Sequence, residues 1–454
     1  MGSVKVPNDA YYGAQTQRAL ENFPISGIQL PRSIINAITI IKRSAAITNN
    51  KLGLLSDTRK NAIIQASDEI IIGKYNNQFP VDIFQTGSGT STNMNCNEVI
   101  SNRANEILGG KIGTKNPIHP NDHVNLGQSS NDVFPSAIHI ASNIMLQKEL
   151  VPVLDNIYLE LKNKSKEFSD IIKIGRTHLQ DATPITLGQE FSAYTQMIKN
   201  GIHRINNTKK LLSELAQGGT AVGTGINTHK DFGSLIAKEI TSFTGINFKE
   251  APNHFEAQSS QDSAVELSGA LKVLAVSLSK IANDIRWLSS GPRAGLKELI
   301  LPAVQPGSSI MPGKTNPVIC ESLIQVSAQV VANDTAITLA GQGGIFQLNL
   351  MLPLIAYNLI NSIYILTNST KIFTNKVIKG LKANKKICAS YIEGSLAMCT
   401  SLVPVIGYDK AAEIAYKAYN SNKTVREIAE KEKILDTKIL DELLDPKSMI
   451  KPNK

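Results

Sequence analysis

The sequence is poor in cysteine, in aromatic residues and in long apolar runs. Its four cysteines, Cys96, Cys320, Cys388 and Cys399, form no Cys-x-x-Cys pair. This argues against a disulfide framework or a zinc site and suggests reduced, buried thiols. Aromatic residues make up 5% of the chain, and no zinc-finger or RNA-recognition signature is present, so we expect no nucleic-acid partner. No apolar run is long enough to cross a bilayer, so we expect no membrane span.

The first residues and the charge balance indicate where such a protein works. Residues 1–7 lack the apolar core of a signal peptide, and Val6 stands where a myristoylation motif needs Ser or Thr. We therefore expect an intracellular, cytoplasmic protein. The net charge is +9, and six lysines between Lys371 and Lys386 have no acidic residue among them. We interpret this run as a solvated face, and a positive field also favours capture of a small dianion.

The hydrophobic periodicity is helical. Helices are predicted over residues 150–161, 187–215, 267–288 and 318–340. The third ends before Gly291-Pro292, and the fourth carries only Glu321 and Asp334 as charges, so protein must surround it on nearly every side. Alternating strand patterns are hardly visible. We therefore predict an all-α fold.

Polar loops between these helices are where chemistry is expected. They lie at residues 86–97, 127–131, 218–227 and 306–317. The last contains the run Gly-Ser-Ser-Ile-Met-Pro-Gly-Lys-Thr-Asn-Pro, from Gly307 to Pro317. Its glycines let backbone N–H groups approach a ligand, Lys314 offers a point charge, and Asn316 adds amide donors. We interpret it as an anion-binding loop, and the alternative is an ordinary helix connection.

This run resembles the signature loop of the fumarase/aspartase superfamily. Further segments are similar to class II fumarases in the expected order, at residues 6–20, 86–104, 119–135, 175–190 and 214–229. The resemblance therefore covers nearly the whole chain. It implies three domains: an N-terminal helical domain (1–133), a central bundle of long helices that carries the signature loop 307–317 (134–384), and a small C-terminal helical domain (385–454). It also implies a homotetramer whose central helices merge and whose active sites are each shared by three subunits.

The activity that the resemblance implies is the reversible addition of water to fumarate, giving L-malate, as in the tricarboxylic acid cycle. It implies no cofactor and no metal. Ser308, on a mobile loop, matches the residue that removes the carbon-bound proton. His178 matches the histidine that handles the water or hydroxyl group, and Glu321 matches the carboxylate that orients it. A serine is a poor base in water, so nearby positive charge and backbone dipoles must stabilise its alkoxide, and Lys314 is the obvious local cation.

Substrate contacts are implied in the same way. The residues that match binding positions of the family are Ser88, Thr90, Ser129, Ser130, Asn131, Thr177, Ser309, Lys314 and Asn316. Individually these could be helix caps or turn residues, and Ser129 to Asp132 looks like a helix start.

A second, noncatalytic dicarboxylate site is implied by the residues that match His119, Pro120, Asn121 and Asp122. His119 and His123, four residues apart, could suggest a metal site. Pro120 and the Asn-Asp pair indicate a loop or helix entry instead, so we expect no metal. The chain departs from the family here, because Asn116 stands where fumarases often carry Arg, and His123 where Asp is usual.

Two alternatives stay open. An aspartate ammonia-lyase shares the fold, the loop and the abstraction of a carbon-bound proton, but expels ammonia. Fumarase is favoured by residues 87–90, Ser130, His178, residues 251–253 and residues 406–412, whereas Gln347 and Leu352 stand where fumarases more often show Glu and Lys. The second alternative is a noncatalytic protein on this fold, as in the lens crystallins of the superfamily. Intact Ser308, His178, Lys314, Asn316 and Glu321 argue against it.

Overall fold

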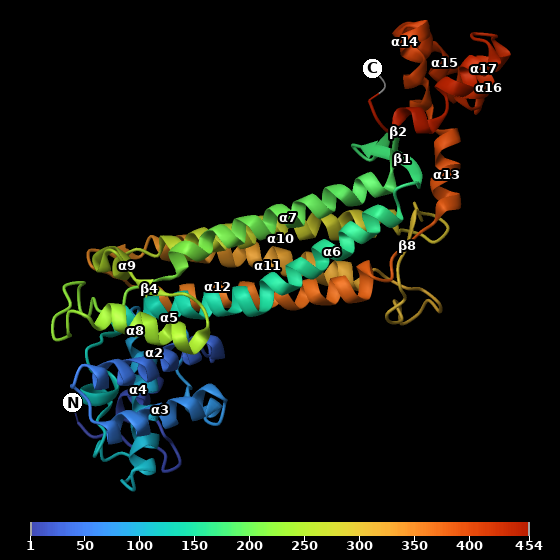
Figure 1. Cartoon of the computed structure of the whole chain (residues 1–454). Helices are drawn as coiled ribbons and strands as arrows, with labels where there is room; N and C mark the ends of the chain where they lie inside the picture. The colour runs from blue at the N-terminus through green and yellow to red at the C-terminus, as the bar shows by residue number, and fades with distance from the viewer. Residues whose placement is uncertain (1, 453–454) are drawn as a thin grey trace. The chain divides into compact units, whose positions relative to one another are not determined.

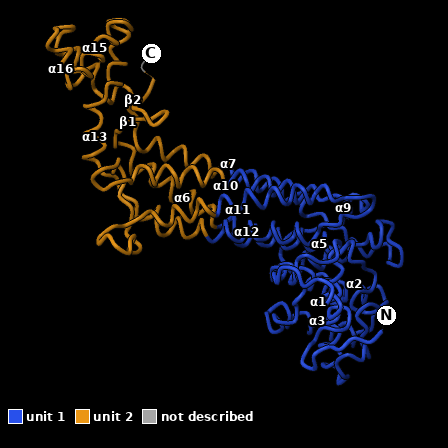
Figure 2. The backbone as a smooth tube through the Cα atoms, turned by 180° about the vertical axis from the view of Figure 1, so that it is seen from behind, with its two compact units in different colours: residues 1–152, 201–275, 326–368 blue, residues 153–200, 276–325, 369–454 orange. Residues whose placement is uncertain are grey.

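The structure, a computed structural model, describes residues 2–452, and helices dominate it (Figure 1). It divides into two compact units (Figure 2): unit 1 comprises residues 1–152, 201–275 and 326–368, and unit 2 comprises residues 153–200, 276–325 and 369–454. The predicted all-α class is confirmed. Among the described residues, no helix taken alone is long and apolar enough to cross a membrane, and one bent pair, Lys385–Gly394 with Leu396–Ile406, meets that test by length and composition only.

Unit 1 is built on a layer of helices around α2. Its helices are α1 (Ala14–Asn22), α2 (Arg32–Lys51), α3 (Asp57–Ile71), α4 (Thr90–Ile107), α5 (Ser130–Met145), α8 (Phe232–Thr244) and α9 (His254–Ser259). Helix α2 packs against α3, α5 and α8. Its side chains Ile34, Ile38, Ile41 and Ala45 recur in steps of four and three and are at most 1% exposed, as a core-facing helix requires.

Short strands and tight turns complete unit 1. Strand β3 (Glu214–Leu215) pairs in parallel with β4 (Lys249–Glu250), and β6 (Gly344–Ile345) pairs antiparallel with β7 (Leu348–Asn349). A 3-10 turn covers Asn76–Gln78, and π-helical turns cover Pro120–Val124 and Leu146–Leu150.

Four long helices contribute to both units: α7 (Leu187–Leu212), α10 (Asp262–Leu288), α11 (Val318–Gly341) and α12 (Leu352–Phe373). The helices predicted over residues 267–288 and 318–340 are confirmed. The one predicted over residues 187–215 ends earlier, because residues 214–215 form β3. One chain leaves part of α11 uncovered, since Val331 is 39% exposed and Leu339 60% exposed. The expectation that protein surrounds this helix therefore concerns an assembly of chains and stays a prediction.

Unit 2 contains α6 (Val151–Glu167) from residue 153 onward, a β-hairpin, and the C-terminal helices. The hairpin pairs β1 (Ile172–Thr177) with β2 (Gln180–Thr186), and β5 (Leu299–Ile300) pairs with β8 (Lys382–Ala383). The remaining elements are a π-helical turn at Thr374–Ile378, 3-10 turns at Leu396–Leu402 and Pro446–Met449, and helices α13 (Lys385–Gly394), α14 (Val403–Ile406), α15 (Tyr408–Ser421), α16 (Val425–Lys431) and α17 (Thr437–Leu443). A small core formed by Leu402, Ile414, Ile428 and Leu440 holds the last helices together, and Ile174 of β1 joins it.

Two simpler predictions are also tested. The six lysines between Lys371 and Lys386 all have exposed side chains, which confirms a solvated face. The cysteines are free thiols, as expected; Cys96, Cys320 and Cys388 are buried, and Cys399 is half-buried.

Candidate functional site

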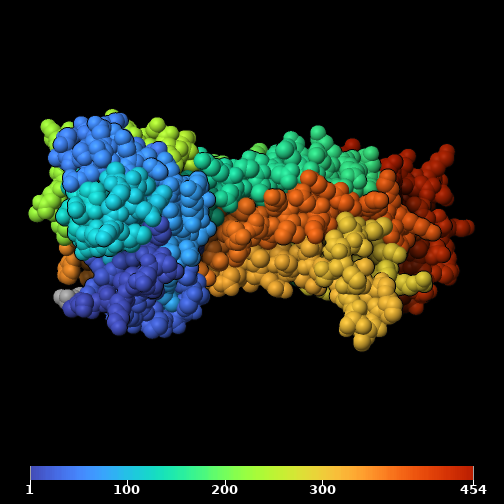
Figure 3. All heavy atoms as spheres, turned by 90° about the horizontal axis from the view of Figure 1, so that it is seen from below, coloured from blue at the N-terminus to red at the C-terminus, as the bar shows by residue number. Residues whose placement is uncertain are grey.

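The predicted anion-binding loop, Gly307 to Pro317, closes on itself. The Gly307 N–H donates to the Lys314 carbonyl at 2.8 Å, and Asn316 Nδ2 donates to the Gly307 carbonyl at 2.7 Å. A Cβ on residue 307 would lie 2.7 Å from the Asn316 backbone nitrogen, so this close approach requires glycine. In Figure 3 the segment that holds the loop (yellow-orange) stands out from its neighbours in unit 2. Hydrogen bonds between its two ends therefore fix the conformation of the loop, which lies on an exposed part of the unit.

Ser308 has two backbone donors directed at its side chain. The N–H groups of Ile310 and Met311 donate to Ser308 Oγ, at 3.2 and 3.0 Å. Donors in this arrangement stabilise negative charge on the oxygen that accepts them. The hydroxyl is half-buried, and that of Ser309 is exposed. The loop thus places Ser308 where its deprotonated form would be stabilised.

A cavity of about 560 Å³ lies next to the loop in unit 2. Lys314, Asn316 and Glu321 line it, together with Arg286 and Lys297, which the sequence did not single out. Its volume falls in the usual range for small-molecule sites, and its three cations against one carboxylate favour an anionic ligand.

Thr177 and His178 lie at the tip of the β1–β2 hairpin, an element that the sequence did not reveal. Thr177 pairs with Gln180, so His178 and Leu179 form a two-residue turn, and both have positive φ, 56° and 61°. Such turns favour Asn and Gly, and a left-handed conformation costs other residues roughly 1–2 kcal/mol each. The side chains of Thr177 and His178 are exposed. Across the described residues, no hydrogen bond or ion pair joins His178 to Glu321, so their pairing stays a prediction.

A buried ionic network fixes β1 directly before Thr177. Arg176 donates from both terminal nitrogens to the two oxygens of Glu298, at 2.9 and 3.0 Å. Lys173 Nζ lies 3.3 Å from Glu298 and 3.1 Å from Glu190. Glu298 and Lys173 are at most 1% exposed, and burial raises the pKa of Glu190. A bidentate Arg–carboxylate pair in this setting constrains the strand geometrically.

Ser88 and Thr90 lie at the start of α4, not within a long loop. The predicted loop 86–97 is wrong from Thr90 onward, because the helix begins there. Gly89 has φ 73°, and a Cβ on it would lie 2.1 Å from the Phe134 ring, so only glycine fits between the two hydroxyl residues. The Ser88 and Thr90 hydroxyl oxygens are 2.7 Å apart. The turn therefore presents two adjacent hydroxyls.

Ser129, Ser130 and Asn131 form the N-terminus of α5, as predicted. Ser129 Oγ accepts from the Asn131 N–H at 3.2 Å, and Asp132 Oδ1 accepts from the Ser129 N–H at 2.9 Å, which makes a capping box. Asp132 Oδ2 also accepts from the Thr220 N–H at 2.9 Å. Burial raises the pKa of Asp132 to about 7.

A polar pocket of about 350 Å³ opens at this helix end. Ser129 and Ser130 line it with Asn93, Asn125 and Gln128. Hydroxyls, amides and the positive end of a helix dipole all favour a carboxylate. Thr220 and Ala221 of the predicted loop 218–227 form another wall of the pocket.

The residues predicted for a second dicarboxylate site form the π-helical turn Pro120–Val124 and the residue before it. His119 Nδ1 accepts from the N–H groups of Asn121 and Asp122, both at 3.2 Å, so the predicted helix entry is confirmed. The side chains of Asn121 and Asp122 are exposed, whereas Pro120 is buried. His123 Nδ1 accepts from the His119 N–H at 2.8 Å, and burial lowers the pKa of His123.

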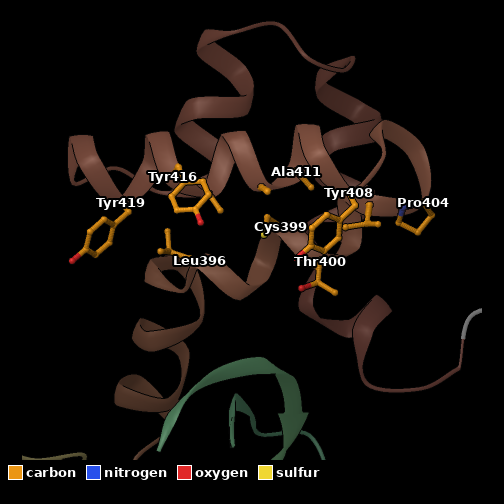
Figure 4. Close-up of a pocket in the computed structure, with 11 residues that line it drawn as sticks. Leu396, Cys399, Thr400, Pro404, Tyr408, Ala411, Tyr416 and Tyr419 are labelled. Atoms are coloured by element: carbon orange, nitrogen blue, oxygen red, sulfur yellow. The ribbon is translucent and has the colours of Figure 1, made fainter. Parts of the chain in front are cut away.

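An apolar cavity of about 630 Å³ in the C-terminal helices carries none of the predicted residues. Tyr408, Tyr416 and Tyr419 of α15 surround it opposite Leu396 and Cys399 (Figure 4). It has few polar groups, so it does not resemble a dicarboxylate site.

Comparison with known proteins decides the family. A family model described as "Lyase" matches residues 2–332, and one described as "Fumarase C C-terminus" matches residues 398–451. Mitochondrial fumarate hydratase of Saccharomyces cerevisiae is 51% identical over 453 residues, which cover 99% of this chain and 93% of that protein. The chain belongs to the class II fumarases, within the fumarase/aspartase lyase family.

Bacterial relatives and solved structures agree with this membership. Fumarate hydratase class II 2 of Bradyrhizobium diazoefficiens is 49% identical over 451 residues, covering 99% of this chain and 95% of that protein. The crystal structure of recombinant class II fumarase from Schistosoma mansoni superposes with a TM-score of 0.97 at 41% identity, covering 100% of this chain and 98% of that one. The fumarase/aspartase fold inferred from the signature loop is therefore confirmed.

Two of the departures from the class II fumarase pattern, Gln347 and Leu352, lie in the segment that contains β6, β7 and the start of α12. Gln347 is exposed at the β6–β7 turn, whereas Leu352 is wholly buried at the start of α12. The Leu352 N–H donates to the Gly87 carbonyl at 3.0 Å, and a Cβ on Gly87 would lie 1.9 Å from the Leu350 carbonyl oxygen. An apolar side chain at residue 352 thus packs where the family more often carries lysine.

Proposed function

We propose that the chain catalyses the reversible addition of water to fumarate, giving L-malate, with Ser308 as the base for the carbon-bound proton. The observation that carries this proposal is the pair of N–H donors from Ile310 and Met311 on Ser308 Oγ. These donors favour the alkoxide, and closing the site over the substrate would exclude competing water.

As the proton leaves, the neighbouring carboxylate gains a second negative charge. Lys314, Asn316 and Ser309 are the proposed donors to it, all on the same loop. One preset donor of this kind is typically worth about 3 kcal/mol in the transition state. The other carboxylate would bind hydroxyls and amides of Ser88, Thr90, Thr177 and Ser129 to Asn131. Its support is the polar pocket at the N-terminus of α5, where Ser129 and Ser130 lie.

His178 is the proposed group that exchanges a proton with the water or leaving hydroxyl, with Glu321 raising its basicity. An imidazole suits this step because it titrates near neutral pH. Its side chain is exposed at the tip of the hairpin, so a substrate can reach it. The chemistry asks for no cofactor.

A homotetramer with active sites shared by three subunits is part of the proposal. Its support is apolar surface in unit 1, where Phe346 is 88% exposed, Leu339 60% and Ile345 59%. Large apolar side chains this exposed would gain from burial against another chain. Light scattering at several protein concentrations tests the assembly, and a monomer at every concentration would refute it.

Three further expectations stay proposals. His119 to Asp122 are proposed as the second dicarboxylate site, with equilibrium binding of malate to a Ser308→Ala variant as the test. The division into domains 1–133, 134–384 and 385–454 is testable by limited proteolysis. The cytoplasmic location is testable by fractionation of source cells, since the similar yeast protein is named mitochondrial.

The activity itself is tested by adding the purified protein to fumarate, with and without ammonium, and following the ultraviolet loss of the double bond. We expect equal loss in both. If the double bond is lost only with ammonium, the protein is an aspartate ammonia-lyase, the alternative that Gln347 and Leu352 left open. If it is lost in neither mixture, the protein does not catalyse a reaction of fumarate. Ser308→Ala should form the same oligomer and lose at least about a thousandfold in kcat; a wild-type rate would remove Ser308 from its role.

A further inference from the structure

Lys42, in the middle of α2, is a wholly buried lysine with amide partners. Its side chain is 0% exposed. Nζ donates to Asn125 Oδ1 at 2.7 Å and to Gln128 Oε1 at 3.0 Å. Within residues 2–452, it forms no ion pair with a carboxylate. Burying a lysine side chain without a charged partner is costly, so we expect Lys42 to have a structural or functional role.

The contact with Lys42 fixes the orientation of the Asn125 amide. The ammonium form of Lys42 only donates, and its neutral amine keeps two N–H donors, so in either form Nζ can donate to the Asn125 oxygen. The other end of the same amide agrees, because Asn125 Nδ2 donates to the Gln128 carbonyl at 3.1 Å. Asn125 Oδ1 is therefore an acceptor toward every neighbour, and it also receives Asn97 Nδ2 at 3.2 Å.

Asn93 of α4 links Asn125 to Ser130 and donates hydrogen bonds to both. Its Nδ2 donates to Asn125 Oδ1 at 3.3 Å and to Ser130 Oγ at 3.0 Å, which uses both hydrogens of the amide. Its Oδ1 is buried and accepts no hydrogen bond from the described residues. Flipping this amide would set two oxygens against each other at Asn125. Ser130 Oγ is therefore an acceptor on its inner side.

The Ser130 hydroxyl proton is consequently left for the pocket. Ser130 is 8% exposed and lines the polar pocket of about 350 Å³. No described residue accepts its hydrogen. Helices α2, α4 and α5, which carry Lys42, Asn93 and Ser130, pack on one another (Figure 1). A carboxylate in the pocket would supply the missing acceptor.

We propose that Lys42 is a positioning residue for substrate binding. It sets the direction of the hydrogen-bond chain Lys42–Asn125–Asn93–Ser130, so that the Ser130 hydroxyl donates a hydrogen bond to a carboxylate of the substrate. This rests on the proposed function, because it takes Ser130 as a substrate contact. The hydrogen bond from Ser130 to the carboxylate forms when fumarate or malate binds, before any covalent bond changes. Losing it should therefore weaken substrate binding. The effect should appear in KM and leave kcat nearly unchanged.

A double-mutant cycle tests the proposal by comparing Lys42→Met, Ser130→Ala and the double variant in steady-state fumarate hydration. A hydrogen bond to a charged group is worth about tenfold or more in affinity. We expect Ser130→Ala and Lys42→Met each to raise KM about tenfold, with kcat within about threefold of wild type. If Lys42 acts through Ser130, the double variant should be no worse than Ser130→Ala alone.

Two further variants guard the test. Lys164→Met is the matched control, because Lys164 is also a buried helical lysine, 8% exposed, but lies in unit 2 and donates to Glu167 and to the Leu381 carbonyl. Its KM should stay at the wild-type value. Asn93→Leu, nearly isosteric, breaks the chain without touching Lys42, so it keeps the test valid if Lys42→Met fails to fold. It should raise KM as Lys42→Met does and show no further effect beside Ser130→Ala.

The outcomes separate this proposal from the proposed function. A wild-type KM in folded Lys42→Met, or a hundredfold, additive rise in the double variant, overturns the role of Lys42 while leaving fumarate hydration standing. An unchanged KM in Ser130→Ala overturns both the substrate contact and the chain that serves it. An inactive wild-type protein would instead refute the proposed function.

Discussion

Replacing Glu298 by Ala would remove the carboxylate on which Arg176 and Lys173 converge. The loss leaves a buried guanidinium without its bidentate partner, whereas Lys173 keeps Glu190 at 3.1 Å. Breaking a buried ion pair by deleting one member typically costs about 3–5 kcal/mol, because the other charge stays buried. We therefore expect Glu298→Ala to lower the free energy of unfolding by about that amount. Glu298→Gln keeps one acceptor for Arg176 and should fall between Ala and wild type.

The matched control is Glu167→Ala, which removes an ion pair of similar length from the same unit. Lys164 and Glu167 are 2.8 Å apart, but the Glu167 side chain is 53% exposed. Lys164 is buried but keeps the Leu381 carbonyl as an acceptor, and solvent reaches Glu167, so the loss of this pair should cost less than the loss of a fully buried pair. Urea unfolding at one fixed protein concentration measures both variants, since the stability of an oligomer depends on concentration. The chain has a single tryptophan, Trp287, which lies in unit 2 and reports unfolding there by fluorescence. Equal destabilisation by the two alanine variants would refute the reasoning.

The remaining predictions concern catalysis, packing and pH. His178→Asn should slow hydration more than solvent exchange of the carbon-bound proton, followed by deuterium incorporation; equal losses would contradict the division of labour with Ser308. Gly87→Ala should destabilise by about 1–3 kcal/mol in thermal unfolding, because its Cβ would lie 1.9 Å from a carbonyl oxygen, whereas Gly269→Ala, with open space around its Cβ, should stabilise slightly. Burial lowers the pKa of Lys42 to about 7 from its ordinary 10.5, so the folded state binds fewer protons than the unfolded state between these values. The difference in unfolding free energy between wild type and Lys42→Met should therefore rise with pH between about 7 and 10.5, by at most about 1.4 kcal/mol per pH unit. A difference that does not change with pH would show that Lys42 does not titrate in this way.

The sequence predicted the long helices well because their apolar periodicity is a property of the core that they share. It failed where polar residues are buried. Residues 90–97 look like a loop from their Ser, Thr and Asn content, yet they begin α4, because Asn93 and Asn97 find buried partners in Asn125. Composition alone cannot show that such side chains satisfy one another inside a protein.

The candidate site shows the same limit. Lys314 and Asn316 stood out because the composition of their loop is local, and Ser308 stood out through the resemblance to the family. Arg286 and Lys297 were not, since they reach the cavity only through the fold. Lys42 gave no signal either: a lysine within a helix is normally exposed, and only tertiary structure reveals that it is buried. A run of Asn at alternate positions of a helix was the one available hint of a buried polar network.

The turn at His178 and Leu179 restricts which sequences this hairpin can accept. Glycine or asparagine would relax both positions, and a neutral drift of the sequence would be expected to install them, since each would relieve strain in the folded state. Neither carries an imidazole. The positive φ of His178 supports the role proposed for this residue, because the imidazole is present although Asn or Gly would relieve the strain. Libraries that randomise residues 178 and 179 under selection for stability alone should lose the histidine, whereas selection for turnover should retain it.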